Sequence, residues 1–168
     1  MRVSEIMTTN PACCIPSDTA QTAAIIMRDE DTGIVPVVEN KGSRKLVGVV
    51  TDRDLCIGVI AERPQTTDGG LDPTNAPIEQ FMTAQVVTCS TDRDLEDVLA
   101  LMRENQVRRV LVVDQKNEIQ GVVSFSDLMM RGAIPKGETR QTLKSISMPT
   151  GEASKPRAES ADAASKTK

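Results

Sequence analysis

GVVTDRDL occupies residues 48–55 of the chain, and GVVSFSDL occupies residues 121–128. Both stretches begin with an apolar Gly-Val-Val run, continue with a hydroxyl residue, and reach Asp-Leu three positions later. A chain of 168 residues therefore carries nearly the same pattern twice. Self-similarity of this kind predicts a duplicated structural unit.

The similarity extends upstream of both stretches at an offset of 75 residues, and a gap of two residues in the loop at 40–45 then aligns Gly48 with Gly121. The identical pairs before the gap are Met7 and Met82, Thr8 and Thr83, Cys14 and Cys89, Met27 and Met102, Arg28 and Arg103, Val35 and Val110, Val37 and Val112, and Val38 and Val113. The repeated unit spans about 55–60 residues.

Each copy begins with a helical lead-in, a short strand and a turn with helix-capping side chains. The lead-ins are residues 3–8 and 78–83, the strands are residues 12–15 and 86–89, and the capping turns are Ser17-Asp18 and Ser90-Thr91-Asp92. An amphipathic helix follows, shown in the second copy by helical spacing of Leu95, Val98, Leu99 and Met102.

Two more strands and a helix complete each copy. The runs IVPVV and VLVVD lack alternation, which predicts strands buried on both faces. KLVGVV and EIQGVV form the next strands, and TDRDL and SFSDL open the last helices. The order is therefore β-α-β-β-α, repeated, in the α+β (α/β) class.

One such unit is too small to bury a large core alone, so we expect two units packed with pseudo-twofold symmetry. The first covers residues 1–60 and the second residues 77–135, joined by a linker at 61–76 rich in Pro, Gly, Asp and Thr. Residues 136–168 read as a mostly disordered tail, with one marginal helical turn at 139–148.

Charge and composition exclude several classes of function. Residues 1–135 carry a net charge of −7 and residues 136–168 a net charge of +3, so the body is too acidic for a nucleic-acid-binding surface. Histidine is absent, which removes the most frequent general base and any Ser-His-Asp mechanism. Because no long apolar run or signal peptide is visible, we expect a cytoplasmic protein that does not enter membranes.

The cysteines are Cys13, Cys14, Cys56 and Cys89, and none forms a C-x-x-C pair. We expect them to serve as small buried apolar residues and expect no metal site. A redox or soft-metal role is the alternative.

Thr51 with Asp54 and Ser124 with Asp127 permit two interpretations. A hydroxyl at a strand end and a carboxylate three residues later form a common helix cap. The same pair suits a nucleotide, because the hydroxyl contacts a phosphate near the helix N-terminus and the carboxylate accepts bonds from a ribose diol.

The duplicated unit, the Met-Thr lead-in, the PVV strand and the repeated Gly-Val-Val-[Ser/Thr]-x-x-Asp pattern resemble a tandem pair of CBS domains, or Bateman module. The resemblance covers residues 1–135 and implies a stand-alone, bacterial-type CBS-pair protein without an attached catalytic domain. It implies two clefts between the units that bind adenosyl ligands such as AMP, ADP, ATP, S-adenosylmethionine or NAD.

The resemblance assigns the ribose to Asp127 and Asp54, and the phosphate to Ser124 and Thr51. The apolar candidates for adenine are Val122 with the stretch around Gly33 in one cleft, and Val49 with the stretch around Val107 in the other.

Arg108 and Arg109 precede the apolar strand of the second copy, where the first copy has Gly33 and Ile34. The resemblance implies that basic residues here reach ligand phosphates, a role that suits the planar guanidinium. The alternative is that both arginines are solvated or pair with the acidic surface. We expect the Asp127 cleft to bind phosphorylated adenosine better than the Asp54 cleft, where Arg53 offers partial compensation.

The leading hypothesis is a non-catalytic sensor, and no cofactor is required. An adenosyl effector would shift the relative arrangement of the units and so change contact with a target protein. A homodimer is expected from the resemblance. The alternatives are a ligand-free dimerisation or interaction module and, less favoured, an enzyme or a nucleic-acid-binding protein.

Overall fold

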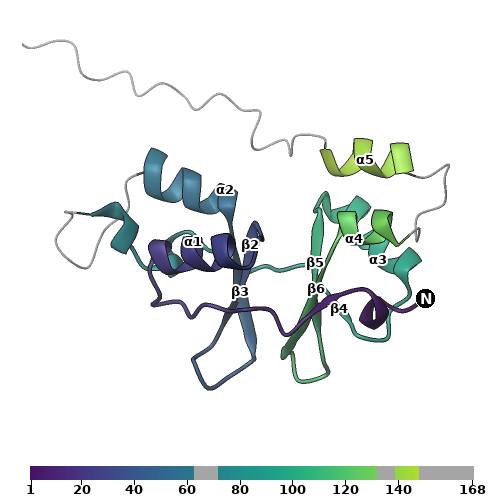
Figure 1. Cartoon of the computed structure of the whole chain (residues 1–168), viewed down its shortest axis with the longest axis horizontal. Helices are drawn as coiled ribbons and strands as arrows, with labels where there is room; N and C mark the ends of the chain where they lie inside the picture. The colour runs from purple at the N-terminus through teal and green to yellow at the C-terminus, as the bar shows by residue number, and fades with distance from the viewer. Residues whose placement is uncertain (63–71, 132–138, 148–168) are drawn as a thin grey trace, which may run out of the picture.

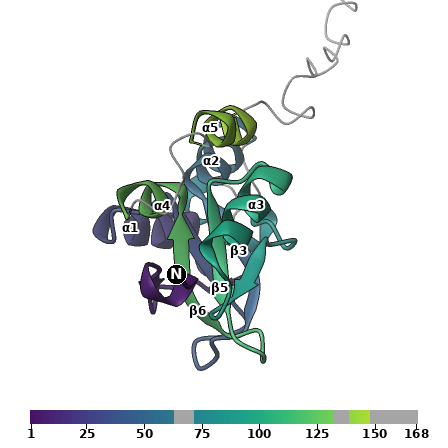
Figure 2. The same ribbon diagram turned by 90° about the vertical axis from the view of Figure 1, so that its right-hand side faces the viewer.

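The computed structural model describes residues 1–62, 72–131 and 139–147 (Figure 1). Two antiparallel hairpins lie side by side at its centre, with both turns at one end of the molecule and most of the helices towards the other (Figures 1 and 2). Each hairpin belongs to one copy of the repeat, and each copy also contains helices, which confirms the predicted mixed α and β class.

The helices and strands follow the predicted order from the long helix of each copy onwards, whereas a short strand at residues 8–9 begins in a lead-in that was predicted to be helical. They are β1 (Thr8–Thr9), α1 (Ala20–Asp29), β2 (Ile34–Val38), β3 (Leu46–Thr51), α2 (Asp52–Leu55), β4 (Thr88–Ser90), α3 (Leu95–Asn105), β5 (Arg109–Val113), β6 (Ile119–Ser124), α4 (Phe125–Met130) and α5 (Thr139–Ser147). A π-helical segment, Cys56–Ala61, continues α2.

The sheets of the two copies have the same strand arrangement, but the sheet of the second copy has four strands and that of the first has two. The four strands run in the order β1-β6-β5-β4, with β4 parallel to β5 and the other pairs antiparallel. In the first copy β2 pairs with β3, and single bridges replace the outer strands: Cys14 to Val37, and Val49 to Thr83.

The lead-in segments are exchanged between the copies. Thr8 precedes the first copy but pairs with Val122 of the second, and Thr83 precedes the second copy but pairs with Val49 of the first. The packing follows the pairing, because Val3 lies in the core of the second unit. The predicted ranges 1–60 and 77–135 thus describe order along the chain, while each unit's core takes a lead-in from the other copy.

Pseudo-twofold symmetry is visible in the hydrogen bonds between the hairpins. The Leu46 N–H donates to the Asn117 carbonyl oxygen (2.9 Å), and the Ile119 N–H donates to the Arg44 carbonyl oxygen (2.8 Å). Both partners of one bond lie 73 residues from their counterparts in the other. A shared apolar cluster joins the units: Ile34, Val38, Leu46, Val49, Leu111, Val113 and Ile119.

Each unit also has its own core beneath its long helix. The four apolar positions predicted on the second amphipathic helix, α3, are all buried, and so are all five residues of β2. The first core comprises Cys14, Ala23, Met27, Val35, Val37, Val50 and Ile78. The chain has no Trp or Tyr, so these cores are filled almost entirely by aliphatic and sulfur-containing side chains.

The first elements of each copy are shorter than predicted. The lead-ins contain single 3₁₀ turns, Val3–Glu5 and Ile78–Gln80, and the predicted strand at 12–15 is reduced to the bridge at Cys14. The predicted caps are also displaced: α1 begins at the N-cap Thr19 and α3 at the N-cap Asp94. Asp18 instead accepts the Ile15 N–H (2.9 Å), which closes the turn before the helix.

The α5 helix corrects the prediction of one marginal turn at 139–148. It has nine residues and packs against α3, because Ile146 is buried in the core of the second unit. Ser145 Oγ donates to the Arg103 carbonyl oxygen (3.3 Å) in the last turns of α3. The disorder predicted for the rest of the tail, and most of the predicted linker, fall outside the described residues.

Candidate functional site

The predicted pair Ser124 and Asp127 forms a reciprocal capping box where β6 ends and α4 begins. Asp127 Oδ2 accepts the Ser124 N–H (2.7 Å) and the Ser124 hydroxyl (2.6 Å), and the Asp127 N–H donates to Ser124 Oγ (3.2 Å). The helix-cap interpretation therefore describes this arrangement correctly.

Thr51 and Asp54 repeat the arrangement where β3 enters α2. Asp54 Oδ2 accepts the Thr51 N–H (2.9 Å) and hydroxyl (2.7 Å), and the Asp54 N–H donates to Thr51 Oγ1 (3.2 Å). Both carboxylates are half-buried, and these bonds use only one oxygen of each. A carboxylate offers acceptor sites on both oxygens, so capping does not exhaust its capacity for a ligand.

Arg109 links the Ser124 box to the first unit. It lies opposite Ser124 in the strand register of β5 and β6. A Cβ atom placed on Gly33, in the first unit, would lie 3.5 Å from Arg109 Nη2. The structure therefore places Arg109, which lies opposite Ser124, close to Gly33 of the other unit, and these residues are among those predicted for the Asp127 cleft.

The two adjacent arginines have different neighbours. Arg108 is exposed, and its Nη2 donates to Ser147 Oγ of α5 (3.4 Å). Its carbonyl oxygen accepts the Phe125 N–H (2.9 Å), which holds the start of β5 against the start of α4. Successive side chains along a strand point to opposite faces, so Arg108 contacts α5 while Arg109 turns towards Gly33.

The apolar residues predicted to contact adenine lie in two different hydrophobic clusters. Val122 is half-buried and packs against the central cluster, to which Val49 belongs. Val107 packs instead against the core of the second unit. The structure thus keeps Val122 near both units but places Val49 and Val107 in different clusters. Arg53, beside Asp54, is exposed.

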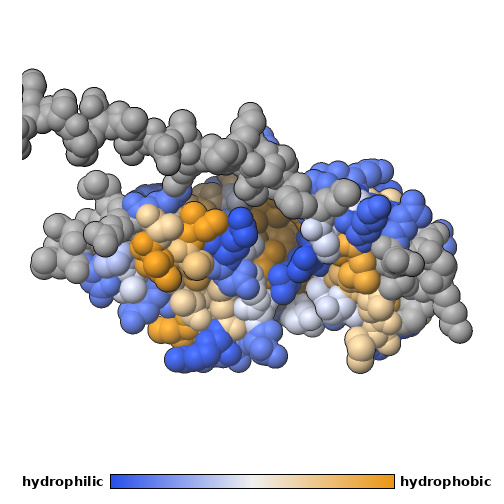
Figure 3. Space-filling view, turned by 90° about the horizontal axis from the view of Figure 1, so that it is seen from above, coloured by the Kyte–Doolittle hydropathy of each residue, from blue (hydrophilic) through white to orange (hydrophobic). Residues whose placement is uncertain are grey.

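The helix-bearing side of the molecule is hollowed between its two halves. Figure 3 looks onto this side and shows apolar side chains deep in the hollow, with hydrophilic side chains on both flanks. Both capping boxes begin helices at the strand ends away from the hairpin turns, so they lie towards this side. An apolar floor with polar sides suits a ligand that has a flat base and a charged end.

Asp52 is a neighbour of this site that the sequence analysis missed. A Cβ atom on Gly33 would lie 2.6 Å from Asp52 Oδ2, and the Asp52 N–H donates to the Gly33 carbonyl oxygen (3.2 Å). One signal was present in the sequence: the residue equivalent to Asp52 in the second copy is Phe125. At this position the two copies therefore differ in charge and in shape.

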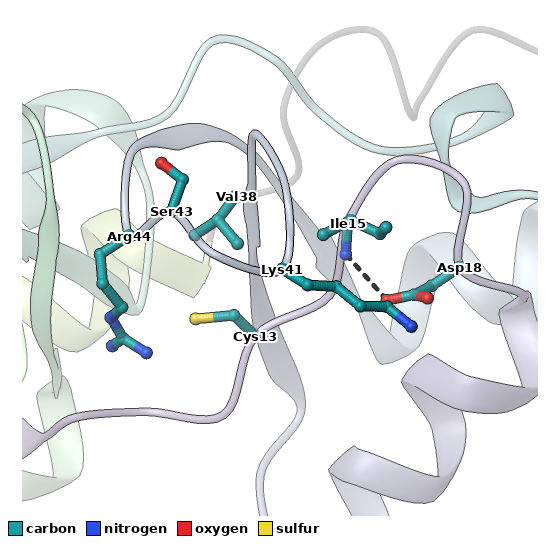
Figure 4. Close-up of a pocket in the computed structure, with 7 residues that line it drawn as sticks. All are labelled: Cys13, Ile15, Asp18, Val38, Lys41, Ser43 and Arg44. Atoms are coloured by element: carbon teal, nitrogen blue, oxygen red, sulfur yellow. Dashed lines mark hydrogen bonds between the residues drawn. The ribbon is translucent and has the colours of Figure 1, made fainter.

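A separate pocket of about 290 Å³ lies beside the turn of the first hairpin (Figure 4). Its lining residues are Cys13, Ile15, Asp18, Val38, Lys41, Ser43 and Arg44. The Arg44 guanidinium is already bonded to the carbonyl oxygens of Pro11 and Ile119. None of the predicted site residues lines this pocket.

The predicted burial of the cysteines is confirmed for Cys14 and Cys89, while Cys13 is half-buried. Cys14 and Cys89 are buried, and burial raises the pKa of the Cys14 thiol to about 12 and that of Cys89 to about 11. Burial also raises the pKa of half-buried Cys13, against the opposing charge of Arg44. All three are protonated at neutral pH and so are poor nucleophiles. Cys56 is exposed, contrary to the prediction of burial.

The described residues also bear on metal binding and on membrane insertion. Within residues 1–62, 72–131 and 139–147, no three side chains of the metal-ligating types gather where they could hold an ion. Over the same ranges, no helix combines the length and apolar character needed to cross a membrane.

A family model and a related protein both match this chain as a protein with CBS domains. The sequence model of the family described as CBS domain matches twice, at residues 3–60 and 78–133. The CBS domain-containing protein YhcV of Bacillus subtilis is 36% identical over 126 residues, which cover 75% of this chain and 81% of YhcV.

Two solved structures are similar in fold. The crystal structure of Hypoxic Response Protein I, with two coordinated zinc ions, has a TM-score of 0.64 and 28% identity, covering 80% of this chain and 100% of that one. The curated relative Hypoxic response protein 1 is from Mycobacterium tuberculosis. The CBS domain pair of protein MJ0100, in complex with 5-methylthioadenosine and S-adenosyl-L-methionine, has a TM-score of 0.66 and 23% identity, covering 79% of this chain and 96% of that one.

Proposed function

The chain belongs to the CBS domain family, and on this premise we propose that it is a non-catalytic regulatory module that binds a phosphorylated adenosyl ligand. The observation that carries the proposal is the meeting of the Ser124–Asp127 box with Arg109 and with Gly33 of the other unit. AMP is the simplest ligand that fits this set of groups, and ADP and ATP share its chemistry.

Each group has a role that matches its chemistry. Asp127 accepts hydrogen bonds from the ribose 2′- and 3′-hydroxyls through the oxygen that the capping box does not use. Ser124 and the Arg109 guanidinium hold the phosphate, since arginine can bind two phosphate oxygens at once. Half-buried Val122 supplies apolar surface for adenine. The adenosyl compounds bound by the MJ0100 pair support this ligand class for the fold.

The second cleft is weaker for phosphates. Ile34 stands there at the position equivalent to Arg109, so the Thr51–Asp54 box lacks the matching guanidinium. Its Asp54 carboxylate can still hold a ribose. This cleft therefore suits an adenosyl ligand without a phosphate, or stays empty when only AMP is present.

The proposed signal is a change in the arrangement of the two units. A ligand that touches Asp127 in one unit and Gly33 in the other favours one relative arrangement over others, and a ligand can shift an equilibrium only by such a preference. The output is contact with a target protein, made by a homodimer of the module. Nucleic acid is an unsuitable partner because residues 1–135 carry a net charge of −7.

A specific observation favours a second candidate function, a ligand-free interaction module. Both carboxylates are already engaged in complete capping boxes, so neither is an unsatisfied group waiting for a ligand. In that case Asp54 and Asp127 serve only to begin helices.

Calorimetric titration of the full chain with AMP decides between the two candidates. We expect binding in the wild type, loss of binding in Asp127→Ala, and retention in the matched variant Asp54→Ala, which removes the equivalent cap in the other unit. Both variants lose one capping box, so circular dichroism must first show that both remain folded. Absence of AMP binding by the wild type would establish the ligand-free module.

A further inference from the structure

Two charged groups, one from each unit, approach Gly33. Asp52 comes from the first turn of α2, and its N–H donates to the Gly33 carbonyl oxygen (3.2 Å), which fixes the start of the helix against this residue. Arg109 comes from the start of β5 in the other unit. The position of a Cβ atom on Gly33 lies 2.6 Å from Asp52 Oδ2 and 3.5 Å from Arg109 Nη2. The carboxylate and the guanidinium are therefore within about 6 Å of each other.

Glycine at residue 33 allows this approach without displacing the exposed Asp52 side chain. A side chain at residue 33 would force the Asp52 carboxylate to move away, because 2.6 Å is well inside van der Waals contact. The equivalent place in the other half of the molecule contains different chemistry. There the residues equivalent to Gly33, Arg109 and Asp52 are Arg108, Ile34 and Phe125. The position of the Asp52 carboxylate is therefore taken by an aromatic ring.

The carboxylate has two effects on a ligand held by Arg109. It partly neutralises the guanidinium in the ligand-free protein, and it repels the negative charge of a phosphate bound there. The repulsion grows with the number of charges that the phosphate chain brings near Asp52. A ligand without phosphate experiences neither effect.

We propose that Asp52 is the specificity-determining residue of the Asp127 cleft, and that it favours adenosyl ligands of low charge, such as AMP, over ATP. This inference rests on the proposed function and identifies the ligand class more closely. Asp52 acts through Arg109 and through the field of its charge, and it makes no bond to the ligand.

The test is a calorimetric titration of the full chain with adenosine, AMP and ATP. The wild type is compared with Asp52→Asn and with Glu39→Gln, which changes net charge equally but lies beyond the other end of β2 from Gly33. In Asp52→Asn we expect affinity for AMP to rise roughly threefold and affinity for ATP roughly tenfold, with adenosine unchanged. Glu39→Gln should leave all three affinities within experimental error.

Salt separates the electrostatic effect from a structural one. In 0.5 M salt the screening length falls to roughly 4 Å, so the gains in Asp52→Asn should largely disappear. Asp52→Ser is a second variant that also removes the charge. Circular dichroism of both variants shows whether they remain folded. An unchanged ratio of ATP to AMP affinity in both Asp52 variants would overturn the inference, as would an equal change for all three ligands. A wild type that binds none of the three overturns the proposed function as well.

Discussion

Gly48 and Gly121 explain why the repeated stretches begin with glycine. A Cβ atom on Gly121 would lie 2.6 Å from Met7 Sδ and 2.8 Å from the Thr8 carbonyl oxygen. On Gly48 it would lie 3.0 Å from the Thr83 carbonyl oxygen, with the sulfur of the preceding methionine at 3.1 Å. The glycine of each copy thus receives the Met-Thr lead-in of the other, and two separate repeated motifs prove to be one contact made twice.

Replacing these glycines with alanine should destabilise the fold unequally. We expect Gly121→Ala to cost about 2–3 kcal/mol, because the Thr8 backbone oxygen cannot move aside cheaply, and Gly48→Ala to cost about 1 kcal/mol. Urea unfolding followed by circular dichroism measures both. Equal costs, or no cost at either position, would show that the lead-ins are not packed against these strands as described.

At the scale of elements, α5 lies outside the repeat. Its Thr142 side chain is fully buried, and among the described residues Oγ1 has no hydrogen-bond partner. Burying a hydroxyl without a partner costs free energy that an apolar side chain of the same shape would not lose.

Thr142→Val should therefore stabilise the protein by about 1 kcal/mol. Thr19→Val is the matched comparison, because the Thr19 hydroxyl accepts the Thr22 N–H (3.1 Å) and caps α1, so its loss should cost about 1 kcal/mol. Thermal unfolding of both variants measures whether each change raises or lowers the stability of the protein. A loss of stability in Thr142→Val would mean that the hydroxyl has a partner or that α5 does not pack on α3.

Local patterns predicted the elements well where the pattern was long and periodic. The spacing of Leu95, Val98, Leu99 and Met102 predicted α3, and the unbroken apolar run predicted the fully buried β2. The first helix was predicted to start after Ser17-Asp18, but the cap is Thr19, because several neighbouring side chains were all competent to cap.

Contacts between distant segments could not be predicted in the same way. The exchange of the lead-ins depends on pairing between Thr8 and Val122, which are far apart along the chain. The different neighbours of Arg108 and Arg109 follow from alternation at the start of β5 and from the position of α5. The repeat in the sequence was enough to identify Thr51 and Ser124 as equivalent residues of the candidate site.

At the scale of the whole molecule, the pseudo-twofold axis relates exposed apolar residues as well as the core. Ile57, in the segment that continues α2, and Met130, at the end of α4, occupy equivalent positions and are 39% and 87% exposed. Ile60 nearby is 73% exposed. Large exposed apolar side chains on both units favour association through these helices.

We therefore predict a homodimer by sedimentation velocity, converted to monomer by Ile57→Asp combined with Met130→Asp. The control is Asn40→Asp with Gln115→Asp, which adds the same charge at the equivalent exposed turns of the two hairpins. A wild-type monomer, or a dimer equally weakened by both pairs of changes, would contradict a helix-mediated interface.

The central claim is that the two copies build one preferred site for a phosphorylated adenosyl ligand, and a crystal structure of the full chain with AMP tests it most directly. The account predicts the ribose diol on Asp127, the phosphate beside Ser124 and Arg109, and contact with Gly33 of the other unit. AMP bound with its ribose on Asp54 alone, or both clefts empty at saturating AMP, would contradict the account.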